Sequence, residues 1–341
     1  MSITLSAEKL TAAQAFAEIL TAGKRVCLTT HVNPDGDGIG SEVGLIHLLR
    51  GLGIDAVVAN PTATPDRFAF LFADLPRVDR SPEAIKALRS AEVIVVLDIS
   101  DLGRLGMLSQ TVVEQGVPVA CIDHHVSPGT LPPGPRYLDP GAAATGELIC
   151  EIALANRWPL TPAVARALYV ALVTDTGGFR FSNTHPRTLR IAAELLETGL
   201  DPESIYLDVY AGAPKGRPRL LAETLETLVV EEAAGLAWVT VPPGALERHG
   251  VGVDDLDGIV EFPRSVAGVR MAVLFREMSQ GRVKVSLRSV GEVDVAAFAR
   301  PYGGGGHKHA AGVALPGALP EVQAIILAAA RDYLQSIAPS P

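Results

Sequence analysis

Cysteine is scarce in this sequence of 341 residues, which contains three: Cys27, Cys121 and Cys150. None belongs to a CxxC pair and the number is odd, so neither a disulfide framework nor a thiolate zinc site is expected. Long apolar runs are also missing, because no segment reaches the roughly 18 residues of a membrane-spanning helix. The first ten residues include Glu8 and Lys9 and contain no uninterrupted apolar segment. The expected location is therefore the cytoplasm, with no membrane partner.

Aromatic residues make up 5% of the chain, which argues against a stacking platform for an extended single-stranded nucleic acid. Basic residues are the minority charge, 29 Lys and Arg against 38 Asp and Glu, so the formal net charge is −9. An acidic protein does not attract a polyanion over long range, and no basic stripe matches a long duplex. Long duplex nucleic acid is therefore not an expected partner.

Hydrophobic residues are plentiful, at 48% of the chain, and the length favours two domains over one. The stretch AGAPKGRPR, residues 211–219, concentrates glycine, proline and basic residues and is the candidate linker. We expect a catalytic domain over residues 1–210, a linker over 211–221 and a second domain over 222–341.

Three short apolar runs alternate with helix-like segments in the first part of the chain: RVCLTTH, AEVIVVLDIS and VPVACIDHH. This alternation predicts an α/β domain with a mainly parallel sheet. Each run ends in polar residues, namely His31, Asp98 and the triplet Asp123, His124 and His125. Ligands of open α/β sheets bind outside the carboxyl ends of the strands, so we expect these side chains to converge on one crevice.

The pattern turns helical from about 144 to 210, and Asp175 lies at the end of the second of three amphipathic segments. Farther along, GLAWVTVP, GVRMAVLFREM and RVKVSLRSV have the composition of strands. The glycine-rich stretch YGGGGHKHAAG, expected to be a loop, and a terminal helix near 319–337 follow them. These segments predict a second, smaller α/β domain.

The stretch TTHVNPDGDGIGS, residues 29–41, is the most unusual in the chain. By itself NPDGDG predicts a tight loop, because Asn, Asp, Pro and Gly are the residues that turns use. Together with the other strand ends it contributes to a set of six imidazole and carboxylate donors: His31, Asp35, Asp37, Asp98, His124 and Asp175. This donor set suits divalent Mn, Zn, Fe or Mg. Six donors are enough for two ions that share a bridging carboxylate, an arrangement suited to phosphoryl displacement by water.

Five motifs carry a resemblance to a known family: HVNPDGDGIGS, VVLDISD, CIDHH, LVTDTGGFRF and GGGGHKHAAG. Their order and approximate spacing are similar to those of the DHH phosphoesterase superfamily, in its branch with a DHHA1 domain. Within that branch the chain most resembles the NrnA-type oligoribonucleases and phosphatases of 3′-phosphoadenosine 5′-phosphate (pAp). The similarity extends from about residue 25 to 312, nearly the whole chain.

The resemblance implies roles for the six donors. His31 and Asp35 would bind one ion, Asp37 and His124 the other, and Asp98 would bridge the two. Asp175 would complete the second ion site. The implied cofactors are two divalent metal ions, with Mn²⁺ as the first expectation and Mg²⁺ as the alternative.

Three residues form the catalytic set that the resemblance implies: Asp98, Asp123 and His125. Asp123 would orient an imidazole, a role that general physics also expects of a carboxylate beside a metal-bound histidine. His125 would face the phosphate and assist the transition-state charge or the leaving oxygen.

A local excess of basic residues marks the second domain. Residues 262–312 contain eight Lys and Arg against three acidic residues, which favours an anionic ligand. The alternating RVKVSLRS puts its polar residues on one strand face, although a solvated face is the ordinary explanation. The resemblance implies four substrate-binding residues: Arg288, Gly305, Gly306 and His307.

The resemblance implies a two-metal phosphohydrolase that degrades short RNA to mononucleotides and dephosphorylates pAp, with the linear dinucleotide pApA or cyclic dinucleotides as further candidate substrates. Two alternatives stay open at this point. A RecJ-like single-strand DNA exonuclease shares the motifs but adds an oligonucleotide-binding fold, and a nonenzymatic nucleotide sensor would be expected to lose one of the six donors. A homodimer is the expected oligomeric state on general grounds.

Overall fold

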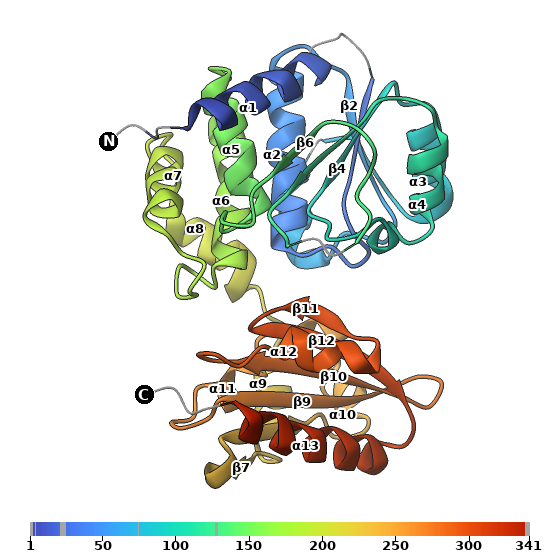
Figure 1. Cartoon of the computed structure of the whole chain (residues 1–341), viewed down its shortest axis with the longest axis vertical. Coiled ribbons are helices and arrows are strands. Elements are labelled where there is room, and N and C mark those ends of the chain that lie inside the picture. Colours follow the sequence, from blue (N-terminus) through green and yellow to red (C-terminus); the bar gives the residue numbers. More distant parts are fainter. Residues whose placement is uncertain (1–2, 4, 21–24, 74, 127–128, 338–341) are drawn as a thin grey trace. The chain divides into compact units, whose positions relative to one another are not determined.

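The computed structural model describes residues 3, 5–20, 25–73, 75–126 and 129–337. The chain divides into two compact units, Met1–Gly212 and Ala213–Pro341, each built on one six-stranded sheet with helices (Figure 1). The prediction of a two-domain α/β protein is confirmed. The expected linker, 211–221, overlaps helix α9, which begins at Arg217, so the second half of that segment is helical. The domain limits of the sequence analysis stay a prediction.

The first sheet is entirely parallel, in the strand order β3-β2-β1-β4-β5-β6. Its strands are β1 (Val26–Thr29), β2 (Ala56–Asn60), β3 (Arg77–Asp79), β4 (Val93–Leu97), β5 (Val119–Asp123) and β6 (Arg136–Leu138). The central strands β1, β4 and β5 are buried along their whole length. Because helices cover both faces, these strands are continuous apolar runs without alternation.

The helices of the first unit form two layers against this sheet. They are α1 (Ala7–Leu20), α2 (Gly36–Gly51), α3 (Ser81–Arg89), α4 (Leu108–Glu114), α5 (Thr145–Ala155), α6 (Pro162–Asp175), α7 (Pro186–Leu196) and α8 (Pro202–Tyr206). Helices α3 and α4 pack on one face, and α1, α2 and α5 contribute to the core on the other (Figure 1). Helix α6 packs on α2 and α5, so the second layer is itself two helices deep.

The strand order reverses at the centre of the sheet. Strand β1 lies between β2 and β4, and the chain adds β2 and β3 on one side before it returns to add β4, β5 and β6 on the other. The carboxyl ends of β1 and β4 are therefore the switch point of the sheet, which is where open α/β sheets bind ligands.

The structure corrects the expected loop at residues 29–41. Helix α2 begins at Gly36, so Gly36, Gly38 and Gly40 lie in the helix and not in a turn. Helix α2 packs closely on α6, and a Cβ atom at Gly40 would lie 2.5 Å from the Ala167 carbonyl oxygen. Gly36 and Gly40 allow the two helices to approach each other closely, although these helices are more than 100 residues apart in the sequence, while a Cβ atom at Gly38 would instead meet Thr30.

The second sheet is mixed, in the order β11-β12-β10-β9-β8-β7, with only β8 and β9 parallel. Its strands are β7 (Val229–Glu231), β8 (Leu236–Thr240), β9 (Met271–Met278), β10 (Arg282–Ser289), β11 (Gly305–His307) and β12 (Ala310–Pro316). The helices of this unit are α9 (Arg217–Leu225), α10 (Ala245–His249), α11 (Glu261–Arg264), α12 (Val295–Ala299) and α13 (Leu319–Ser336).

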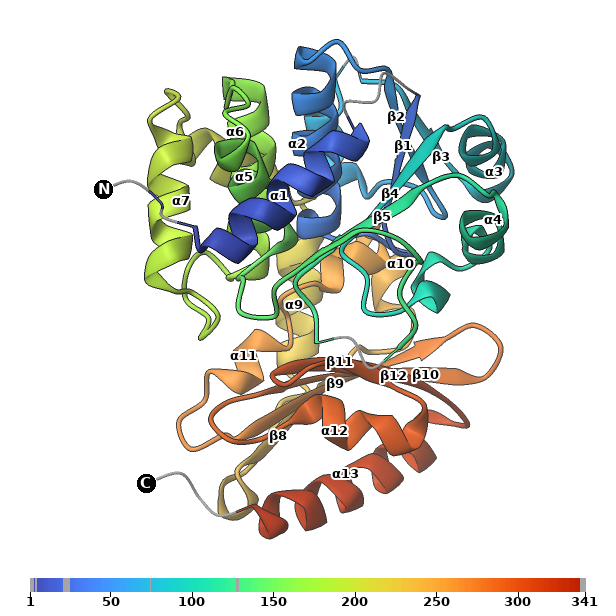
Figure 2. The same ribbon diagram turned by 45° about the horizontal axis from the view of Figure 1, so that its top comes forward.

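The two faces of the second sheet are covered differently. Helices α12 and α13 pack on one face (Figure 2), while α9, α10 and α11 pack on the other face over β8 and the first half of β9. The glycine-rich stretch, expected to be a loop, forms the short strand β11 and the turn into β12. Glycine is rare in strands, so this stretch by itself predicts a loop. It forms a strand here because it pairs with β12.

The strands β2, β3, β6, β7 and β12 had no clear sequence signal, and most of them are short or lie near sheet edges. None of the described helices combines the length and the apolar content needed to span a bilayer.

Candidate metal centre

The first side chain of the centre, His31, lies two residues after the end of strand β1. His31 is 3% exposed, and its Nδ1 lies 2.9 Å from the Val32 carbonyl oxygen. A carbonyl only accepts, so in the neutral ring Nδ1 carries the proton and Nε2 presents its lone pair. This Nε2 lies 3.8 Å from Asp35 Oδ2 and 3.6 Å from Asp98 Oδ2.

Asp35 and Asp37, two residues apart, have different environments. Asp35 is the N-cap of α2, accepts the amide N–H groups of Asp37 and Gly38, and has a side chain that is 54% exposed. Asp37 lies inside the first turn and is 1% exposed. Its carboxylate accepts the amide N–H of Thr145 at 2.6 Å and that of Gly146 at 3.0 Å.

Asp98 follows strand β4 and occupies the centre of the cluster. Its φ is +57°, in the left-handed region that non-glycine residues seldom adopt, and such strain tends to persist where function requires it. Oδ2 faces His31, and Oδ1 faces His124 at 3.6 Å while accepting the Thr145 hydroxyl at 3.1 Å. The two carboxylate oxygens of Asp98 therefore face two different groups of side chains.

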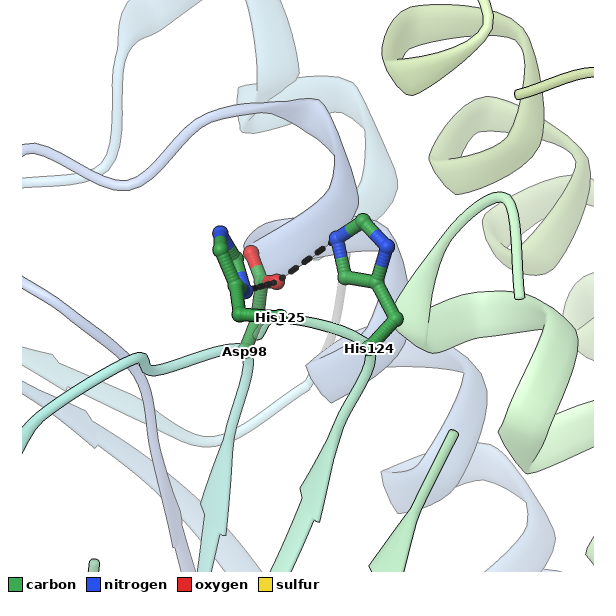
Figure 3. A group of neighbouring side chains, drawn as sticks. All are labelled: Asp98, His124 and His125. Atoms are coloured by element: carbon green, nitrogen blue, oxygen red, sulfur yellow. Dashed lines mark ion pairs between the residues drawn. The ribbon is translucent and has the colours of Figure 1, made fainter. Parts of the chain in front are cut away.

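The side chains of the triplet Asp123, His124 and His125, at the end of β5, have separate partners. His124 Nδ1 lies 3.3 Å from the Ala142 carbonyl oxygen, and Nε2 lies 3.6 Å from each of Asp37 Oδ2, Asp98 Oδ1 and Asp175 Oδ2. His125 Nδ1 lies 2.7 Å from Asp123 Oδ1 and 3.5 Å from Asp98 Oδ1. Figure 3 shows both imidazoles directed at the Asp98 carboxylate.

The structure brings all six predicted donors together within the first unit. Two groups of three have ligand atoms within 4.8 Å of one another: His31, Asp35 and Asp98, and Asp37, His124 and Asp175. A third such group contains Asp98, His124 and His125. Ligands about 2.1 Å from a single ion lie roughly 3 to 3.5 Å apart, which is close to the separations found here.

The electrostatics of the centre require added positive charge. Burial and the neighbouring carboxylates raise the pKa of Asp37 and Asp175 well above the usual range of aspartate. Burial acts on Asp98 in the same direction, but the nearby imidazoles outweigh it and lower the pKa of Asp98. Burial would lower the pKa of His124, and the surrounding carboxylates raise it instead. Clustered carboxylates with imidazole lone pairs fit divalent cations, which supply this charge without protonation.

Backbone amides at the start of α5 belong to the centre, although the sequence analysis did not include them. Thr145 and Gly146 donate to Asp37, and the Thr145 hydroxyl donates to Asp98. The first amides of a helix lack partners within the helix and attract anions, so the helix start at ATGE was the available signal. Ser41, one turn after Asp37, donates its hydroxyl to that carboxylate at 3.1 Å.

The four expected substrate residues lie in the second unit, on neighbouring strands. Arg288 of β10 and His307 of β11 both pair with Ala310 of β12, one on each side. Arg288 Nε donates to Glu261 at 2.9 Å, and His307 is exposed. Gly305 and Gly306 complete β11 and are exposed.

Comparison with known proteins identifies the family. Residues 25–172 match the DHH family N-terminal domain, and residues 236–336 match the DHHA1 domain. The bifunctional oligoribonuclease and PAP phosphatase NrnA of Thermus thermophilus is 34% identical over 331 residues, which cover 93% of each chain. The chain belongs to the DHH family.

Two further relatives agree with this assignment. The protein of the same name from Bacillus subtilis is 27% identical, over 85% of this chain and 89% of its own length. The crystal structure of an exopolyphosphatase-related protein from Bacteroides fragilis superposes with a TM-score of 0.89 at 28% identity, covering 96% of this chain and 97% of that one. This DHH protein therefore has the domain content and fold expected from its motifs.

Proposed function

We propose that this DHH protein is a metal-dependent phosphohydrolase that releases mononucleotides from very short RNA oligomers and dephosphorylates pAp, with pApA as a further substrate. The observation that carries the proposal is the convergence of six imidazole and carboxylate donors at the switch point of the sheet. The names of the relatives, oligoribonuclease and PAP phosphatase, supply the substrate class.

The proposed metal ligands fall into two sets that share Asp98. His31 and Asp35 would hold one divalent ion, and Asp37, His124 and Asp175 the other, with Mn²⁺ as the preferred ion. Asp98 would bridge them, because its two oxygens face the two sets. Such ions supply Lewis acidity toward water and the phosphoryl oxygens.

His125 is proposed to act on the substrate and not as a metal ligand. Its Nδ1 lies 2.7 Å from Asp123, which is fully buried and also accepts the His125 backbone N–H at 3.2 Å. Because Nδ1 donates to this carboxylate, Nε2 is the ring nitrogen that keeps a lone pair. Asp123 would hold the proton on Nδ1, so that Nε2 exchanges a proton with the leaving oxygen during phosphoryl transfer.

In the second unit, Arg288 and His307, with the amides of Gly305 and Gly306, are proposed to bind the nucleotide and its phosphate. Arginine suits this role because its planar donors contact phosphate bidentately. Arg288 is held by Glu261 in the structure, so a bound phosphate would compete with that carboxylate.

A substrate panel tests the proposal. The chain is assayed with Mn²⁺ or Mg²⁺ on RNAs of two to five nucleotides, pAp, pApA, cyclic-di-AMP and pyrophosphate. We expect mononucleotides from the RNAs and phosphate from pAp, and no turnover by Asp98→Ala. Arg288→Ala should keep its metals and raise KM for nucleotides. Inactivity of the wild-type chain on every compound would favour a nucleotide sensor and contradict the proposal.

A further inference from the structure

Beside the part of the second sheet that packs on α9 and α10, two cations form no ion pair within the described part of the chain. Arg276 of β9 and Lys284 of β10 lie directly opposite each other in the antiparallel ladder, so their side chains share one face. Among the residues described, neither forms an ion pair. Both are half-buried. Two like charges directly opposite each other destabilise a sheet, and burial adds to that cost unless an anion compensates it.

Carboxylates are near these cations but do not pair with them. Arg276 lines a hollow of about 180 Å³ next to the β8–α10 connection, together with Glu247 and Glu277. Neither glutamate lies within ion-pair distance of Arg276. Burial and the charge of Arg276 lower the pKa of Lys284, so the pair lacks local compensation. Arg288 on the same strand differs, because Glu261 neutralises it.

The end of the Lys284 side chain lies beside Gly312 of β12. A methyl group at Gly312 of β12 would lie 3.1 Å from the Lys284 ammonium, so the lysine side chain extends across that strand where a larger residue would obstruct it. Gly312 pairs with Ser286 on one side and with Gly305 on the other. The ammonium therefore lies over the row formed by Ser286, Gly312 and Gly305.

The residues proposed to bind the nucleotide, Arg288 and His307, lie in the adjacent row of the sheet. Arg288 and His307 flank Ala310, two residues from Gly312 along β12. Same-face residues two apart on a strand are separated by roughly 6 to 7 Å. That separation lies within one nucleotide's reach, so a chain bound at Arg288 and His307 would bring its next phosphate to Lys284.

We propose that Arg276 and Lys284 form a second phosphate subsite, which contacts the backbone of RNA longer than a dinucleotide. The inference rests on the proposed function, because it assumes that a nucleotide binds at Arg288 and His307. The subsite brings substrate phosphate to the two opposed cations, with Lys284 over β12 and Arg276 toward the β8–α10 connection, and so extends the binding surface across β10. An unphosphorylated dinucleotide, which has a single phosphate, does not reach it when that phosphate lies at Arg288.

Salt dependence of binding tests the subsite. A fluorescent pentanucleotide with hydrolysis-resistant phosphorothioate linkages is titrated with the Mn²⁺-loaded chain at several salt concentrations. Each lost contact to a single-stranded phosphate reduces the slope of log K against log salt by about 0.7. We expect this reduction for Arg276→Gln and for Lys284→Gln, and the wild-type slope for Lys284→Arg. Binding of an unphosphorylated dinucleotide should not change.

Arg282→Gln is the matched control. Arg282 lies on the same strand and the same face, but it is exposed and donates to the Ala314 carbonyl. Equal loss of slope in this variant would show diffuse attraction and overturn the subsite, as would wild-type slopes in Arg276→Gln and Lys284→Gln or an equal effect on the dinucleotide. The proposed function is tested separately by turnover: a chain that binds the pentanucleotide through these residues but hydrolyses no substrate contradicts the proposed function and leaves the subsite standing.

Discussion

At the scale of single residues, side chains of the same type in the centre contact different neighbours, and these contacts determine their chemistry. Asp35 caps a helix at the surface, while Asp37, two positions later, is buried against the start of α5. The two histidines of the triplet, His124 and His125, also have different partners. Asp123 holds the ring of His125, and the Ala142 carbonyl directs Nε2 of His124 toward three carboxylates.

Asp35→Asn and Asp37→Asn should therefore differ in stability. Asparagine caps a helix about as well as aspartate, so Asp35→Asn should leave the free energy of unfolding within about 0.5 kcal/mol of wild type. At position 37 the amide group would meet a donor, either Thr145 N–H or Gly146 N–H, at a cost of about 1–3 kcal/mol. Urea unfolding in EDTA measures both. Equal losses in the two variants would contradict the different roles of these aspartates.

At the scale of elements, the packing of α2 on α6 links two proposed metal ligands. Asp37 lies in the first turn of α2, and Asp175 is the last residue of α6. Gly36, Gly40 and Gly44 lie four residues apart along α2, and a Cβ atom at any of them would come within 2.5 Å of an α6 atom. The small residues let the helix axes approach and so set the separation of the two aspartates.

Gly40→Ala should perturb this contact, because the new methyl group would lie 2.5 Å from the Ala167 carbonyl oxygen. Overpacking of this kind costs about 1–3 kcal/mol, and we expect weaker Mn²⁺ binding in addition. Gly51→Ala, at the end of the same helix, is the control, since nothing lies within 4 Å of its added Cβ atom. Thermal unfolding with and without Mn²⁺ checks both. A Gly40→Ala protein as stable as Gly51→Ala would show that the close packing is unnecessary.

A second link between elements is an ionic network around α5. Lys9 of α1 lies 2.6 Å from Asp139 and 2.9 Å from Glu151, and Arg187 of α7 lies 2.8 Å from Asp139. Arg187 also pairs with Glu147 at 2.5 Å, and both glutamates are fully buried. This network holds the helix whose first amides bind Asp37.

The network predicts a specific acid sensitivity. Burial opposes the ionised form of Asp139, but hydrogen bonds from Lys9 and Arg187 outweigh it and lower its pKa to about 2. A lowered pKa contributes stability above the unfolded value near 4, and this contribution is lost as the pH falls toward about 2. The difference in unfolding free energy between wild type and Asp139→Asn should therefore shrink between about pH 5 and pH 3. A difference that stays constant over this range would contradict the assignment.

At the scale of the whole molecule, the sheet topology explains why much of the centre could be predicted from sequence. His31, Asp98 and His124 follow strands, and parallel strands bring their carboxyl ends to one edge. Thr145 and Gly146 were not predicted because the helix start at ATGE indicates unpaired amides but not which carboxylate they contact. The glycines of α2 were misassigned to a loop because their partner, α6, is distant in sequence. The strand β11 could not be predicted from its own glycine-rich sequence, because its formation depends on pairing with β12.

The acidic charge of the molecule also bears on the role of metal. The net charge is −9, and several of these charges are buried in one cluster. Ions that bind only the folded chain stabilise it in proportion to the logarithm of their concentration over Kd. The centre is thus costly without metal and stabilising with it, which joins folding to the proposed activity.

The number of Mn²⁺ ions bound per chain, measured by equilibrium dialysis with elemental analysis, tests the central claim most directly. We predict two ions for wild type, fewer than two for Asp98→Ala with no turnover of dinucleotides, and two for Asp123→Asn, which changes only the partner of His125. An Asp98→Ala protein that binds two ions with wild-type affinity and hydrolyses RNA dinucleotides would contradict the bridged two-ion centre.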